Sequence, residues 1–173
     1  MAARLPTNVE VFFDEADIIV SKTDLKGRIT YANKVFCDIA GYSTAELMGQ
    51  PHSILRHPDM PRCVFKLLWD TIEKGQEVFA YVKNMTKAGD HYWVFAHVTP
   101  SYDANKQIIG YHSNRRVPER RVIEGAIIPL YAQLLAEERR HANGKESLAS
   151  GFQFLTDFVQ SKGMSYDELV FSL

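Results

Sequence analysis

The chain has 173 residues, and its 20 lysines and arginines nearly balance 21 aspartates and glutamates, leaving a formal net charge of −1. This length allows one domain with a real core plus an appended helical segment. The balanced charge provides no overall field to attract nucleic acid or an anionic bilayer, and the apolar runs fall far short of the roughly 20 residues that span a membrane. We therefore expect no nucleic-acid partner and no direct membrane insertion.

The start of the chain and its two cysteines predict a cytoplasmic protein. The segment MAARLPTNVEVFF lacks a basic stretch followed by a sustained apolar stretch, so it does not resemble a secretory signal. Cys37 and Cys63 lie within amphipathic helical patterns and form no CxxC pair. Buried, reduced thiols are therefore favoured over a disulfide or a metal site.

The first predicted elements are a β-hairpin and a short helix. Residues 17–23 and 28–32 are rich in strand-forming side chains and flank the sequence DLKG, in which Asp opens and Gly closes a type I turn. Asn33 then suits the N-cap of a helix, and Gly41 suits its C-terminal stop. This segment therefore begins with two antiparallel strands.

The next segment places several turn-forming residues ahead of a longer helix. Ser43 and Glu46 form a capping box for a second short helix, and HSILR allows about one further turn because Pro58 follows it. Pro61 suits the first turn of the next helix, with Asp59 as its cap or as a partner of the helix dipole. That helix carries one apolar stripe made of Phe65, Leu68, Trp69 and Ile72.

After this helix the apolar pattern alternates with a period of two. Runs 77–86, 91–101 and 107–117 are separated by the turn sequences KAGD and DANK, which predicts an antiparallel meander. In the first run, Asn84 is the polar end of an otherwise apolar face. Together the elements predict an α+β fold with one antiparallel sheet of about five strands and short helices packed on one face.

The pattern becomes helical again in the last part of the chain, where Pro129 predicts a kink. We divide the chain into an N-terminal cap segment at 1–16, the α+β domain at 17–117 and a C-terminal helical extension at 118–173. The extension either packs on the domain or forms a contact with a second copy or a partner. Its apolar positions include Leu130, Leu134, Leu148, Phe152, Leu155 and Val159.

The stretch from TDLKGRITYANKVF through RHPDMP, followed by EVFAYVKNMTKAGDHYWVFAHVTP, closely resembles the FAD-binding PAS domain of Aer-type aerotaxis receptors and of PAS-only energy-taxis proteins. The resemblance runs from about Asp17 to Arg116 and continues more weakly into IIPLYAQL. The combination of GQPH, RHPDMP, VKN and GDHYWV is more specific than the general PAS pattern. The resemblance implies a PAS fold and FAD as the cofactor.

In this family, the Arg-His-Pro-Asp segment, the Asn after the second strand and residues of the third and fourth strands are associated with holding FAD. The relatives usually carry Trp where this chain has Phe79, which keeps a stacking surface but lacks an N–H donor. Alternation alone does not decide which face of run 91–101 meets the cofactor. By position, the resemblance assigns cofactor binding to Asn33, Arg56, His57, Asp59, Phe79, Asn84 and Trp93.

Four of these residues also have a structural interpretation. Arg56 and His57 can face the phosphates of FAD, or Arg56 can form an ion pair with Asp59 that fixes the loop while His57 caps a turn. Asn33 is a plain N-cap by its pattern and can serve both purposes. The basic run that begins at Arg115 is interpreted as a solvated face around a strand end.

Several other kinds of site are less well supported. A haem PAS domain is the closest alternative, but helix 61–74 contains no His and His57 is held next to a proline. Cys63 lies in MPRCVFK, which does not match the sequence around the reactive cysteine of LOV domains. The spacing of His52, His57 and Asp59 fits no standard zinc pattern, so no metal is expected. GxSxG, P-loop, GxGxxG and paired-carboxylate motifs are absent from the sequence.

These observations predict a cytoplasmic FAD-binding PAS sensor of redox, oxygen or energy state, not an enzyme. Reduction of the flavin would change a conformation that is read by a signalling protein, a receptor partner or a second copy in a homodimer. The pathway would be aerotaxis or a related form of chemotaxis signal transduction. The alternatives are a haem-binding gas sensor and a cofactor-free PAS interaction module.

Overall fold

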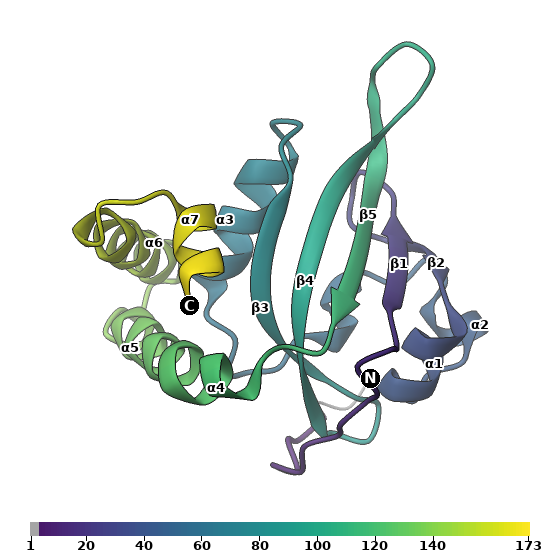
Figure 1. Ribbon diagram of the computed structural model, residues 1–173, viewed down its shortest axis with the longest axis horizontal. Helices are drawn as coiled ribbons and strands as arrows, with labels where there is room; N and C mark the ends of the chain where they lie inside the picture. Colours follow the sequence, from purple (N-terminus) through teal and green to yellow (C-terminus); the bar gives the residue numbers. More distant parts are fainter. Residues whose placement is uncertain (1–3) are drawn as a thin grey trace.

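A five-stranded antiparallel sheet with the strand order β2-β1-β5-β4-β3 forms the centre of the molecule (Figure 1). The computed structural model describes residues 4–173, so the first three residues of the predicted N-terminal cap segment lie outside the described part. The predicted hairpin and meander are confirmed. The strands are β1 (Ile19–Thr23), β2 (Ile29–Ala32), β3 (Val78–Met85), β4 (His91–Tyr102) and β5 (Ile108–Arg116).

Short helices cover one face of this sheet, which we call the inner face. The order of the sheet brings β5 between β1 and β4, so the first hairpin and the meander share one core. Large side chains such as Phe36, Leu47 and Tyr92 are fully buried there. The helices of this layer are α1 (Lys34–Ala40), α2 (Thr44–Leu47), the 3-10 turn η1 (His52–Leu55) and α3 (Arg62–Ile72).

Most helix ends follow the predicted local signals. The Asn33 side chain accepts a hydrogen bond from the Phe36 amide, and Gly41 adopts a left-handed conformation at the end of α1. Ser43 and Glu46 form the predicted capping box. Asp59 does not cap α3; instead, Glu138 accepts hydrogen bonds from the amides that begin this helix. The residues around Asp59 could not have predicted this cap, because Glu138 lies in a distant part of the sequence.

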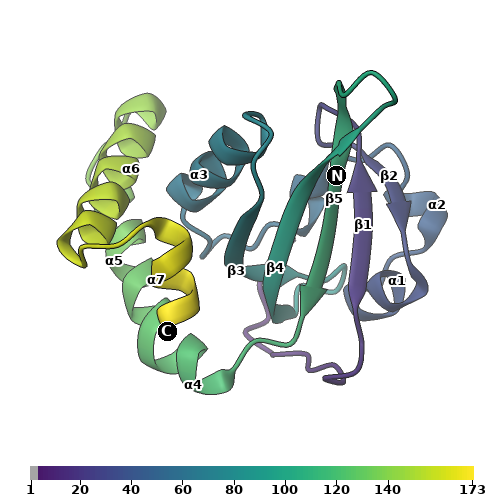
Figure 2. The ribbon, with the colours of Figure 1, turned by 45° about the horizontal axis from the view of Figure 1, so that its top comes forward.

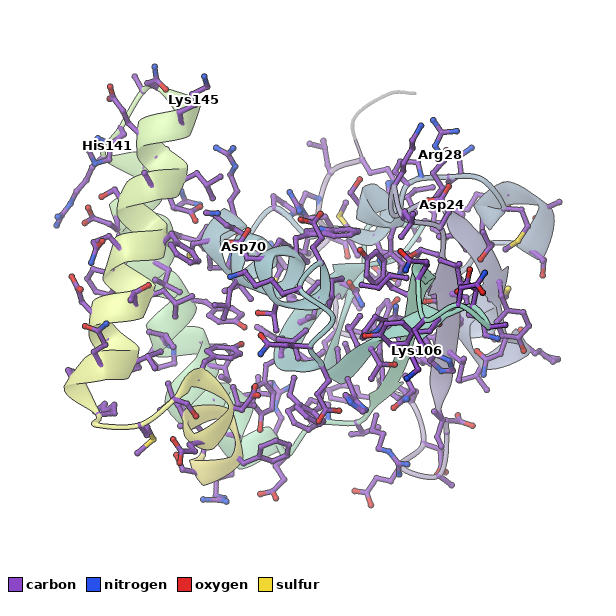
Figure 3. All side chains as sticks on the ribbon, turned by 90° about the horizontal axis from the view of Figure 1, so that it is seen from above. Asp24, Arg28, Asp70, Lys106, His141 and Lys145 are labelled. Atoms are coloured by element: carbon purple, nitrogen blue, oxygen red, sulfur yellow. The ribbon has the colours of Figure 1, made fainter. Side chains whose placement is uncertain are left out.

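The C-terminal helices pack on the rest of the molecule, beside α3 and over β3 (Figure 2). Leu134 and Leu155 are buried in the main core, which shows that the apolar stripe of this segment is covered within the chain. In Figure 3, the loop marked by His141 and Lys145 lies across the molecule from the β1–β2 turn. The helices are α4 (Arg120–Val122), α5 (Ile128–Arg139), α6 (Gly144–Ser161) and α7 (Tyr166–Ser172).

A π-helical segment, η2 (Ile123–Ile127), joins α4 to α5. Its cap bond runs from the Ile128 amide to the Ile123 carbonyl, one residue further than in an α-helix. Pro129 follows in the first turn of α5 and has no amide hydrogen to donate. The predicted irregularity is therefore a wider turn immediately before the proline. Within residues 4–173, no helix has both the length and the apolar character needed to cross a bilayer.

Candidate functional site

A cavity of about 360 Å³ lies between the inner face of the sheet and α3. This volume falls within the range of about 300–1,000 Å³ that small-molecule sites occupy. Both walls are largely apolar, and α3 contributes two aromatic rings to one of them. The apolar lining consists of Phe65, Leu68, Trp69 and Ile72 from α3, with Val82, Ala96 and Val98 from the sheet.

A buried guanidinium forms the polar end of the cavity. Arg115 is only 4% exposed, and its Nη2 donates to the Ser21 hydroxyl at 2.7 Å and to Nε2 of His52 at 2.6 Å. His52 accepts this bond as a neutral ring, since burial and the nearby Arg115 charge lower its pKa to about 3. The interpretation of Arg115 as part of a solvated face was wrong, because β5 lies in the middle of the sheet and this side chain faces inward.

Several donors at this end have no protein partner in the described part of the chain. They are Nη1 of Arg115, Nδ2 of Asn84 and the hydroxyl of Ser113. The residues that line the cavity include no Asp or Glu, so nothing on its walls compensates the Arg115 charge. Burial lowers the pKa of Arg115 to about 10, which leaves it a cation at neutral pH. The site therefore suits a ligand that presents acceptors or negative charge to this end.

Arg56 and Asn84 are the residues assigned by resemblance that line the cavity. Arg56 is exposed at the rim, with its guanidinium carbon 4.0 Å from the centre of the Phe65 ring. Its backbone pairs with that of Asn84 in an isolated β-bridge, which attaches the Arg-His-Pro-Asp loop to the edge strand β3. Lys26 lines the same cavity and is also exposed. The rim is therefore cationic, as phosphate groups require.

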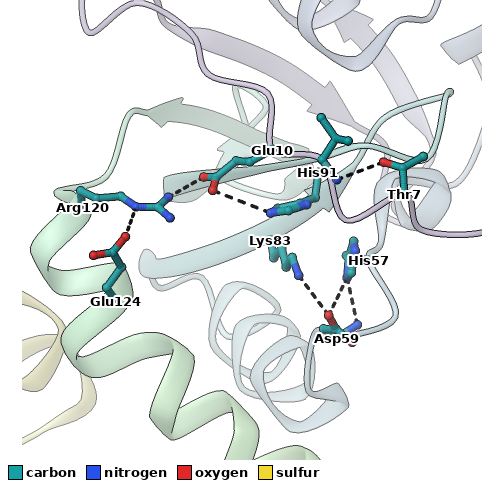
Figure 4. Close-up of polar contacts among 9 residues, drawn as sticks. Thr7, Glu10, His57, Asp59, Lys83, His91, Arg120 and Glu124 are labelled. Carbon is teal, nitrogen blue, oxygen red and sulfur yellow. Dashed lines mark hydrogen bonds and ion pairs between the residues drawn. The ribbon is translucent and has the colours of Figure 1, made fainter.

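His57 and Asp59 are not among the residues that line the cavity; they lie at the contact between the loop and β4 (Figure 4). Nδ1 of His57 accepts a hydrogen bond from the Asp59 amide at 3.1 Å, and its ring lies 5.7 Å from that of His91. Asp59 pairs with Lys83 at 3.0 Å, not with Arg56 as the structural interpretation supposed. Burial lowers the pKa of His57 to about 4. Both residues thus hold the loop in place.

The N-terminal segment extends the same polar cluster (Figure 4). Its backbone pairs with the start of β4, through hydrogen bonds between His91 and the residues on either side of Glu10. The Glu10 carboxylate lies 3.8 Å from Nε2 of His91 and accepts from Arg120 at 2.6 Å. This segment therefore connects the first C-terminal helix to the loop of His57.

The remaining three residues assigned by resemblance lie away from the cavity. Asn33 bonds to backbone atoms at the start of β1 and α1, which makes it a structural cap. Phe79 and Trp93 are on the outer face of the sheet: Phe79 stacks on His97 at 4.2 Å, and Trp93 lies 6.2 Å from Tyr131. The Phe79 ring packs among protein side chains on the opposite face from the cavity, so the structure does not bring it to the cavity wall.

The sequence interpretation missed the polar group formed by Ser21, His52, Ser113 and Arg115. One signal was available: Tyr111, Ser113 and Arg115 alternate along one strand and therefore share a face. Placing that face next to Ser21 required knowing that β5 pairs with β1. Among residues 4–173, no three His, Cys, Asp or Glu side chains lie close enough to hold a metal ion.

The sheet order, the helical layer and the cavity between them define the class of protein. The PAS fold family matches residues 29–115, which is half of the chain, and this chain belongs to that family. The dark structure of the blue-light photoreceptor Aureochrome1 LOV has the same fold, with a TM-score of 0.57 at 22% identity. That similarity covers 66% of this chain and 86% of the photoreceptor chain.

Two relatives narrow the comparison. The aerotaxis receptor of Escherichia coli strain K12 is 44% identical over 119 residues, which cover 68% of this chain and 23% of the receptor. A nitrogen fixation regulatory protein of Klebsiella pneumoniae is 30% identical over 103 residues, covering 60% of this chain and 21% of that protein. The chain thus spans less than a quarter of either relative's length.

Proposed function

We propose that this protein is a flavin-binding PAS sensor of redox, oxygen or energy state, and that its cofactor is FAD. The observation that carries the proposal is the buried Arg115 guanidinium, with an unpartnered Nη1, at the end of a largely apolar cavity. The flavin ring is flat, and one of its edges alternates donors and acceptors. The family resemblance, whose RHPDMP and VKN motifs hold Arg56 and Asn84, supports FAD over other flavins.

The residues present fit this cofactor. Trp69 and Phe65 can cover the ring, and the unpartnered donors of Asn84, Ser113 and Arg115 can bond its polar edge. Arg56 at the rim suits the pyrophosphate, which carries negative charge. When bound, the flavin supplies a reversible electron store whose charge and hydrogen bonding change on reduction.

The signal would leave through the side chains that read this change. Asn84 belongs to β3 and pairs with the backbone of Arg56, so a shift in its hydrogen bonds acts on both the strand and the loop. On the same strand, the Tyr81 carbonyl accepts a hydrogen bond from the Tyr131 hydroxyl of α5 at 2.5 Å. Strand β3 therefore connects the cavity to the C-terminal helices, whose position a partner can sense.

The expected partner is a signalling protein or receptor, and a second copy in a homodimer is the alternative. The similarity to an aerotaxis receptor supports a role in taxis signalling. The proposal contains no catalytic step, and it includes a cytoplasmic location. A cofactor-free interaction module would use the same fold, but it would not explain why three residues with unpartnered buried donors line one cavity.

Haem is disfavoured by the histidine geometry. Two imidazoles are in the cavity lining, those of His52 and His112. Nε2 of His52 already accepts from Arg115, and His112 alternates along β5 with the inward-facing Tyr111 and Ser113. Iron binding through Nε2 of His52 would break the bond and leave the Arg115 cation beside a metal ion. His57 has a free Nε2, but the residue does not line the cavity.

The test is an absorption spectrum of freshly purified protein, with mass analysis of the ligand released on denaturation. We expect flavin bands and the mass of FAD. A Soret band would replace the proposal with the haem sensor, and a colourless protein that takes up neither FAD nor FMN on titration would identify the cofactor-free module. FMN as the released ligand would keep the flavin sensor and correct the cofactor.

A further inference from the structure

Helix α3 forms one wall of the cavity, yet its own sequence does not stabilise its first turn. Pro61 occupies the N-cap position without a side-chain hydrogen bond, and the first turn contains no acidic residue. Arg62 begins the helix, which places a cation at the positive end of the helix dipole. The stabilisation that a local cap normally provides has to come from elsewhere in the chain.

Glu138 of α5 supplies that cap from 75 to 76 positions further along the chain. One carboxylate oxygen accepts from the Cys63 amide at 2.8 Å, and the other accepts from the Arg62 amide at 3.1 Å. Glu138 is only 6% exposed. The two bonds place a negative charge at the start of α3, and the contact satisfies both amides and the buried acid.

Helix α6 closes over the same carboxylate. A Cβ atom on Gly151 would lie 2.6 Å from Cγ of Glu138, so glycine at this position lets the two helices approach. Helix α6 also contacts α3 directly: Nη1 of Arg62 donates to the Gly144 carbonyl at 3.1 Å, and the Lys66 ammonium lies 4.9 Å from the centre of the Phe152 ring. Three helices therefore meet around one buried acid.

The capped turn leads directly into the cavity wall. Phe65, Leu68 and Trp69 follow it on α3, and the Phe65 ring carries the Arg56 guanidinium at the rim. Separation of α5 and α6 from α3 would leave two amides without their acceptor and loosen the turn that positions Phe65.

We infer that Glu138 couples the cavity to the C-terminal helices: it links the docking of α5 and α6 to the position of the α3 wall, so that ligand binding and helix docking strengthen each other. The inference rests on the proposed function, because it requires a ligand in the cavity. By thermodynamic reciprocity, docking of α5 and α6 strengthens ligand binding by the same factor by which the bound ligand strengthens docking. A change that undocks these helices must therefore weaken ligand binding. Glu138 is a positioning residue in this scheme, since it acts through α3 and touches no ligand.

The first experiment measures FAD affinity in the full chain. Glu138→Ala removes the cap, and Gly151→Ala displaces it without changing any charge. We expect both variants to bind FAD more weakly, by up to about tenfold, because the loss of one helix cap sets the upper limit of the effect. The matched controls are Glu146→Ala, at an exposed acid of α6, and Gly125→Ala, where an added Cβ meets no atom within 4 Å. Their FAD affinity should stay within about twofold.

The second experiment measures hydrogen exchange of the same proteins with and without FAD. The α3 amides at Arg62 and Cys63 should exchange faster in both cap variants but not in the controls, and FAD should slow exchange in α5 and α6 of the unaltered chain. If Glu138→Ala does not fold, Gly151→Ala and Glu138→Gln carry the test. Unchanged affinity in the cap variants would overturn the coupling alone. An unaltered chain that binds no FAD would overturn the proposed function and the coupling with it.

Discussion

The two faces of the sheet differ in how their buried groups are satisfied. On the inner face, Arg115, Ser113 and Asn84 line one cavity and carry buried donors without a protein partner. On the outer face, Phe79 stacks with its neighbours and is covered by Phe171 of α7 at 4.6 Å. The comparison teaches that the capacity to bind lies where residues with unpartnered donors also line a cavity, and that the aromatic cluster serves the docking of a helix.

Replacing Arg115 with methionine is the strongest test of the inner face. Loss of a charged donor should weaken flavin binding by about ten- to a hundredfold. Without flavin the variant should unfold at the same or a higher urea concentration, because an uncompensated buried cation is gone and Ser21 and His52 keep each other as partners at 3.3 Å.

Flavin fluorescence titration and urea unfolding measure the two effects of Arg115→Met. Arg116→Met is the control, since Arg116 is the next residue along β5 but is exposed. If the two variants bind flavin equally well, the Arg115 cation does not contribute to flavin binding. The unpartnered donors would then not distinguish the inner face as the binding face.

Asn84→Ala should have a smaller effect, about three- to tenfold weaker flavin binding, as expected for one neutral hydrogen bond. Thr86→Ala sharpens the comparison. The Thr86 hydroxyl is also buried without a partner, but Thr86 does not line the cavity. The Thr86→Ala variant should therefore show unchanged flavin affinity in the same titration. Equal losses in both variants would show that unpartnered atoms near β3 act through stability and not through the ligand.

The pH dependence of stability tests the polar cluster at His57. Burial lowers the pKa of His57 from 6.5 to about 4 in the folded protein. As the pH falls through this interval the unfolded chain takes up the proton first, so stability decreases between pH 6.5 and about 4. His57→Gln should remove part of that decrease. Urea unfolding across the interval measures it, with His141→Gln, in the α5–α6 loop, as the control; parallel curves for the two variants would contradict the prediction.

Phe79→Trp should produce the smallest effect. The relatives usually carry Trp at this position, but the ring of Phe79 lies on the outer face against Phe171 and His97. We expect flavin dissociation to change by no more than about twofold. Markedly slower flavin dissociation from the Trp variant would show that the outer face also contributes to flavin binding.

Much of the fold was predictable because its signals are local. Asn33, Gly41 and the pair Ser43 and Glu46 act within one helical turn, and the structure confirms each of them. The alternating runs predicted the strands for the same reason, and Asn84 was found because it ends an apolar row on one strand. The division into a cap segment, a domain and an extension at residues 16 and 117 stays a prediction.

The candidate site was only partly predictable. Arg56 and Asn84 line the cavity as the resemblance implied, whereas His57 and Asp59, from the same motif as Arg56, serve the loop. Residues that are close in sequence need not point the same way. The chain turns at this loop, so consecutive side chains contact different neighbours.

The sequence by itself determined the strands, the short helices and the residues that begin and end most of them, because these depend on side chains within a few positions. Only the tertiary structure decided that Arg115 is buried, since its environment is made by the pairing of β5 with β1. The start of α3 depends on Glu138 in the same way. The surroundings of the Arg115 side chain and of the first α3 amides are made by residues that are distant in the sequence. A local sequence pattern does not indicate which distant segments come into contact.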